Sequence, residues 1–96
     1  MKENEVVYFD IFDELHIIFN DEVEDVKVVK LDNNVMVEFD ENDAISNIVF
    51  PNFSKMLGTP INSYEHFKVD NVEIKDESIV ISLKWSGPLI NIRLSI

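Results

Sequence analysis

Apolar and polar residues alternate at every second position along much of this 96-residue chain. Successive side chains of an extended strand point to opposite faces, so this period is typical of a strand with one buried face. We therefore expect strands over residues 78–85, 90–96 and 35–39. The residues expected to face inward are Ile79, Ile81, Leu83 and Trp85, then Ile90, Ile92, Leu94 and Ile96, then Val35, Val37 and Phe39.

Short turns rich in Asp, Asn and Gly separate these stretches, and such short links join antiparallel neighbours because a parallel pair needs a long crossover. Helical periodicity is absent except near Asn52–Leu57, where one short turn is expected before Gly58. We predict a single mainly β domain over residues 1–96, an antiparallel sheet or sandwich of about seven or eight strands, with α+β as the alternative. Pro60 is the expected boundary between four or five front strands and about three back strands.

The charge is strongly acidic and unevenly distributed. The chain has 19 acidic and 8 basic residues, and its net charge of −11 is carried by residues 1–43, while residues 44–96 are neutral. Such a surface repels nucleic acid and anionic membranes and attracts a basic protein. The candidate partner-binding acids are the nearly contiguous Asp21, Glu22, Glu24 and Asp25.

Phe12 is the fifth candidate for partner binding. It lies between Asp10 and Asp13, where the pattern predicts a turn. An aromatic ring at such a position either covers the core or contacts another chain, and both interpretations stay open.

The residues that usually carry chemistry are scarce. The chain has no Cys, two His (His16 and His66) and two Gly, so it offers no thiol nucleophile and no glycine-rich phosphate loop. The acids of Asp40–Asp43 and Asp21–Asp25 lack the spacing of a calcium loop, and solvated turns are the better interpretation. We therefore predict no catalytic residue, no metal ligand and no cofactor.

No apolar run is long enough to span a membrane, and no signal-type segment follows the first residues. The absence of Cys agrees with a reducing compartment. We expect a soluble cytoplasmic protein without membrane contact.

Four short segments follow one another in a recognisable order over about residues 5–57. They are Tyr8-Phe9-Asp10, Asp13-Glu14-Leu15-His16-Ile17, Val35 to Ile45, and Asn52-Phe53-Ser54-Lys55-Met56-Leu57. This order resembles the DUF2283 family of small uncharacterised prokaryotic proteins. The resemblance implies a small β-rich fold and an association with compact gene pairs that include toxins and antitoxins, and it supplies no catalytic residue.

These observations favour a small acidic protein-interaction module, such as an inhibitor or antitoxin-like partner of a basic protein. One alternative is a metal-dependent enzyme in which Asp10, Asp13, Asp40 or Asp43 converge in a pocket. The other is a structural subunit of a homo-oligomer that pairs through a strand edge such as Ile90–Ile96.

Overall fold

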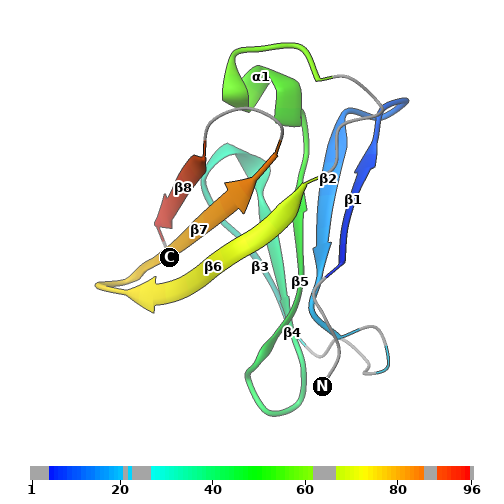
Figure 1. Ribbon diagram of the computed structural model, residues 1–96. Helices are drawn as coiled ribbons and strands as arrows, with labels where there is room; N and C mark the ends of the chain where they lie inside the picture. Colours follow the sequence, from blue (N-terminus) through cyan, green and yellow to red (C-terminus); the bar gives the residue numbers. More distant parts are fainter. Residues whose placement is uncertain (1–4, 21, 23–26, 62–66, 86–88, 96) are drawn as a thin grey trace.

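The computed structural model describes residues 5–20, 22, 27–61, 67–85 and 89–95, and in this part of the chain eight strands form two antiparallel sheets (Figure 1). The five-stranded sheet has the order β1-β2-β5-β4-β3, and the three-stranded sheet has the order β6-β7-β8. The predicted mainly β, antiparallel fold is therefore confirmed. The strands are β1 (Glu5–Phe9), β2 (Glu14–Ile18), β3 (Lys27–Lys30), β4 (Met36–Phe39), β5 (Ile45–Phe50), β6 (Lys68–Lys75), β7 (Ser78–Lys84) and β8 (Ile90–Ser95).

The five strands before Pro60 form one sheet and the three strands after it form the other, as the position of this proline suggested. β5 lies at the centre of the larger sheet because it pairs with both β2 and β4, with Ile17 and Val37 each opposite Ile48. Within this sheet, hairpins join β1 to β2, β3 to β4 and β4 to β5, so every link except the one from β2 to β3 connects neighbouring strands. β8 is an edge strand of the smaller sheet.

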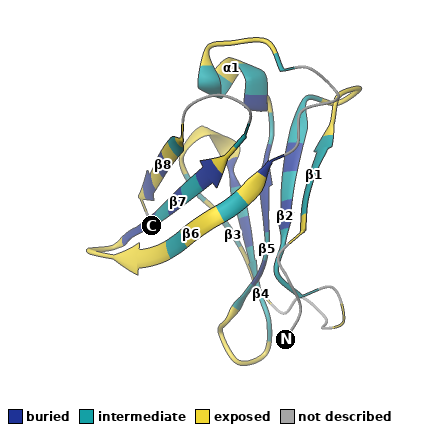
Figure 2. Ribbon diagram, in the orientation of Figure 1, coloured by how far each residue is buried: buried dark blue, intermediate teal, exposed yellow. Residues whose placement is uncertain are grey.

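The two sheets share one hydrophobic core, and Figure 2 shows their buried strands facing each other. The predicted alternation is confirmed most clearly in β7, where Ile79, Ile81 and Leu83 are almost completely buried. Each such aliphatic side chain contributes about 1.5–3 kcal/mol by leaving water. Trp85 and Phe39 are only partly buried against this core, and Ile96 lies outside the described residues.

Aromatic rings close the end of the core beneath the helix α1 (Phe53–Leu57), which is the short helical turn that the sequence predicts. The ring of the fully buried Phe53 lies 5.7 Å from that of Phe50 and 5.6 Å from that of Phe67. Phe67 in turn stacks on Trp85 at 5.7 Å with nearly parallel planes. Phe53 therefore anchors α1 to both sheets.

Gly58 ends the helix, because its φ of 73° is a left-handed conformation that glycine adopts without strain. Its N–H donates to the carbonyls of Ser54 and Lys55, which would otherwise lack a partner in the helix. Among the described residues no helix has the length and apolar character needed to cross a membrane.

Candidate functional site

The turn between β1 and β2 carries the two most exposed large apolar side chains in the described part of the chain, and a third exposed one, Phe9, ends β1 just before it. Ile11 is 87% exposed, Phe12 is 68% exposed and Phe9 is 42% exposed. We call these three residues the apolar tip. Single exposed apolar residues are ordinary on protein surfaces, but three within four successive positions are a candidate for an interaction site. Phe12 does not cover the core.

The turn itself is held by two backbone hydrogen bonds. The N–H of Phe12 donates to the carbonyl of Phe9 at 3.2 Å, and the N–H of Asp13 donates to that of Asp10 at 3.3 Å. Asp13 closes the turn with a φ of 53°, a left-handed conformation that Asp tolerates better than most residues. The next residue, Glu14, then starts β2.

Asp13 also ties the turn to the rest of the molecule. Its Oδ1 accepts the hydroxyl of Tyr8 at 2.6 Å and the N–H of Ser54 at 2.9 Å, and its Oδ2 accepts the hydroxyl of Ser54 at 2.7 Å. Its backbone carbonyl accepts the N–H of Phe53 at 2.9 Å. Four hydrogen bonds therefore join one turn residue to β1 and to the start of α1, and three of them involve a charged acceptor.

This network shifts the pKa values of its two titratable members in opposite directions. For Tyr8, burial and then the hydrogen bond and charge of Asp13 raise the pKa to about 12. For Asp13, burial opposes ionisation, but the hydrogen bonds from Tyr8 and Ser54, with the charge of Lys55, outweigh it and lower the pKa below its usual value. At neutral pH the carboxylate is therefore ionised and the phenol is protonated, as the hydrogen bonds require.

Glu22, the described residue of the predicted acidic segment, lies away from the apolar tip. Of the four residues of that segment only Glu22 is described; Asp21, Glu24 and Asp25 lie outside the described residues. Glu22 is exposed, and its N–H donates to Oδ1 of Asn20 at 3.0 Å. It follows the last residue of β2, whereas Phe12 precedes the first, and the five residues of β2 alone span about 13 Å. The structure therefore separates Phe12 from Glu22.

A second set of acids lies at the Glu22 end of the sheet. The N–H groups of Phe19 and Asn20 both donate to the carbonyl of Ser46, which follows the turn between β4 and β5 (Figure 1). That turn contains Asp40, Glu41 and Asp43. We call Glu22 and these three residues the acidic end. From the sequence, residues 40–43 are expected to form a solvated turn, with a metal site as the less favoured interpretation. Their position at the same end as Glu22 depends on the strand order β2-β5-β4, which no local pattern indicates.

The described residues give little support for metal or acid–base chemistry. No group of three or more His, Asp or Glu side chains among them is placed to hold a metal ion. His16 Nε2 lies 3.0 Å from Oε1 of Glu14, and its ring meets that of Phe9 edge-on at 4.8 Å, on the face of the five-stranded sheet away from the core. His66 lies outside the described residues.

Comparisons of the chain with protein-family models, with curated proteins and with solved structures find no match. The resemblance to DUF2283 stays a prediction.

Proposed function

We propose that this chain is a small acidic protein-interaction module that binds a basic protein, in the manner of an inhibitor or an antitoxin-like partner. The observation that supports it is the apolar tip: Ile11 and Phe12 are exposed on a turn whose backbone is fixed by Asp13. The first contact in this proposal is the insertion of the Phe12 ring into an apolar pocket of the partner.

The fixed backbone matters because binding normally costs the entropy of ordering a loop. The turn is already hydrogen-bonded to Tyr8 and Ser54, so little of that cost remains. Interfaces concentrate their binding energy in a few aromatic or large side chains that fill a pocket on the partner. A prearranged Phe12 meets both conditions.

The net charge of −11 favours a partner with a positively charged surface. Asp10 lies within the turn and Glu14 directly follows it, so a rim of Lys or Arg around the partner's pocket would complement both. The acidic end lies farther away and acts through its long-range field, which raises the rate of encounter more than the strength of the final complex.

The contact role is tested by immobilising the wild-type chain and the Phe12→Ser variant and comparing what each retains from native extract at low salt. The control is Ile74→Ser, which removes another apolar side chain that is 60% exposed, far from the turn. We expect one basic protein to be retained by the wild type and by I74S, and F12S to bind it about 30-fold more weakly. Equal retention by all three chains, or equal loss from both variants, would contradict the proposal.

The charge role is tested with the captured protein by stopped-flow or surface-based kinetics. Replacing Asp40, Glu41 and Asp43 by their amides should slow association by about tenfold at low salt and leave dissociation nearly unchanged. The matched control replaces Glu73, Asp76 and Glu77, three exposed acids at the hairpin between β6 and β7. An equal slowing by both sets would show that only net charge matters, and would reject the acidic end as a steering surface.

A further inference from the structure

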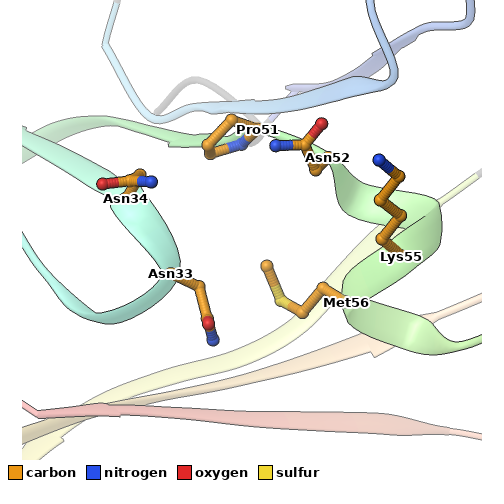
Figure 3. Close-up of a pocket in the computed structure, with 6 residues that line it drawn as sticks. All are labelled: Asn33, Asn34, Pro51, Asn52, Lys55 and Met56. Atoms are coloured by element: carbon orange, nitrogen blue, oxygen red, sulfur yellow. The ribbon is translucent and has the colours of Figure 1, made fainter.

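A hollow of about 270 Å³ lies between the short 3-10 turn η1 (Asp32–Asn34), which joins β3 to β4, and the start of α1. Figure 3 shows its lining residues around an open space, with Asn33 and Asn34 on the η1 side. Lys55 and Met56 come from α1. The full lining is Asn33, Asn34, Pro51, Asn52, Lys55 and Met56. Nothing in the proposed interaction with a protein uses this hollow.

The polar side chains of the hollow have unused hydrogen-bonding capacity. Among the described residues, the carboxamides of Asn33, Asn34 and Asn52 and the ammonium group of Lys55 make no hydrogen bond or ion pair. Three carboxamides offer six N–H donors and Lys55 offers three more.

The charge of the lining is opposite to that of the chain as a whole. No carboxylate lines the hollow, although acids outnumber bases by 19 to 8 in the sequence. Two acids lie near the lining without being part of it. Asp32, which precedes Asn33, accepts the N–H of Ser95 at 3.4 Å. The carboxylate of Asp13 accepts hydrogen bonds from Tyr8 and Ser54, and it also interacts with the charge of Lys55. Lys55 is therefore the single charge of the lining and favours an anion.

The remaining lining residues indicate what the anion carries. Pro51 and Met56 are half-buried apolar side chains, so they suit a short hydrocarbon portion rather than a second charged group. We propose that the hollow binds a small organic carboxylate, with the carboxylate oxygens on Lys55 and the carboxamides and the alkyl part against Met56 and Pro51.

The test titrates the full chain with sodium butyrate and follows backbone and side-chain amide signals by two-dimensional NMR. Butyramide and butylammonium are the control ligands, since they keep the alkyl part and lose the negative charge, and inorganic phosphate keeps the charge and loses the alkyl part. We expect butyrate alone to cause saturable shifts at Asn33, Asn52 and Met56, with a dissociation constant on the order of 1–10 mM.

Two variants separate the site from a general charge effect. Lys55→Gln should weaken butyrate binding about fivefold, the value of one exposed ion pair, while Lys75→Gln on the distant β6 should leave it unchanged. Asn52→Gly removes one carboxamide and keeps the left-handed backbone of that position, so it should weaken binding without unfolding α1. Absence of saturation, equal effects of K55Q and K75Q, or binding of phosphate in place of butyrate would each overturn the proposal.

Discussion

Two hairpin turns of this molecule share a sequence pattern but differ in the hydrogen-bond partners of their Asp side chains. Phe9-Asp10-Ile11-Phe12-Asp13 joins β1 to β2, and Phe39-Asp40-Glu41-Asn42-Asp43 joins β4 to β5, at an offset of 30 residues. In each turn the last Asp is left-handed, and its N–H donates to the carbonyl of the first. The backbone therefore repeats where the sequence pattern does.

The carboxylates of the two turns are used differently. In the second turn Asp40 Oδ1 accepts the N–H groups of Asn42 and Ala44 at 2.8 and 3.0 Å, so the turn satisfies itself and faces water. In the first turn the last carboxylate, Asp13, reaches Tyr8 and Ser54 outside the turn. The first turn is held by hydrogen bonds to residues outside it, so it can present Ile11 and Phe12 to a partner. The second turn is held by its own hydrogen bonds and presents Glu41 and Asn42 to solvent.

The largest effect is expected from removing the support of the first turn. Phe53→Ala deletes a fully buried ring at the start of α1, where it contacts Phe50 and Phe67. The free energy of unfolding should fall by about 3–5 kcal/mol, measured by chemical denaturation. A loss below about 1 kcal/mol would mean that the ring of Phe53 is not part of the core that positions α1.

The next effect compares the two left-handed Asp residues directly. Asp13→Asn keeps the preference for this backbone conformation but removes the charge that accepts the Tyr8 and Ser54 donors, and should destabilise the protein by about 2 kcal/mol. Asp43→Asn, its counterpart at the other turn, should change stability by less than about 0.5 kcal/mol. Equal losses in urea denaturation would remove the distinction between the turns.

The variants Asp13→Asn and Asp43→Asn should also differ in how the free energy of unfolding changes with pH below neutrality. The pKa of Asp13 is lowered in the folded chain, so its contribution is complete above the ordinary Asp pKa and is lost as the pH falls through the folded value. D13N should flatten this part of the profile, and D43N should leave it as steep as in the wild type. The readout is the denaturation midpoint measured between pH 2 and pH 6.

Tyr8 in the first turn's network makes the stability of the protein depend on pH in the alkaline range. Burial and the neighbouring Asp13 raise the pKa of Tyr8 from 10.0 to about 12. A raised pKa means that the folded chain keeps the proton longer than the unfolded chain, so stability is complete below pH 10 and falls as the pH rises toward 12. Since the ring is partly exposed, we expect a loss on the order of 1–2 kcal/mol. Tyr8→Phe should be less stable at pH 7 yet lack this decline, and a decline as steep as that of the wild type would contradict the assignment.

The difference between the turns also marks what local sequence can and cannot predict. The alternation around Ile79 and Ile81 located β7, and Gly58 located the end of α1, because both signals depend on near neighbours. The hydrogen bonds between Asp13 and Ser54 join residues 41 positions apart, and no local pattern indicates them. They depend on the order of the strands, which the alternation leaves open.

The sequence did not predict the acidic end, in which Glu22 shares one end of the sheet with residues 40–43, for the same reason. Glu22 lies at the same end of the sheet as the turn of residues 40–43 because β2 and β4 both pair with β5. The sequence instead grouped Glu22 with Phe12, which lies nearer along the chain but at the other end of β2. Proximity in sequence is a poor guide to proximity across a hairpin, since a strand carries its two ends far apart.

The smallest effect on stability is expected at the equivalent central positions of the two turns, and it decides how Phe12 is interpreted. Because the ring is 68% exposed, Phe12→Ser removes little buried area and should change the free energy of unfolding by less than about 0.5 kcal/mol. Asn42→Ser at the other turn should have a similarly small effect, so the two variants become alike in stability and differ only in binding. A loss above about 1 kcal/mol for F12S alone in urea denaturation would show that the ring covers the core after all. The apolar tip would then be a structural part of the fold, and the retention experiment with F12S would have to be attributed to unfolding rather than to a lost contact.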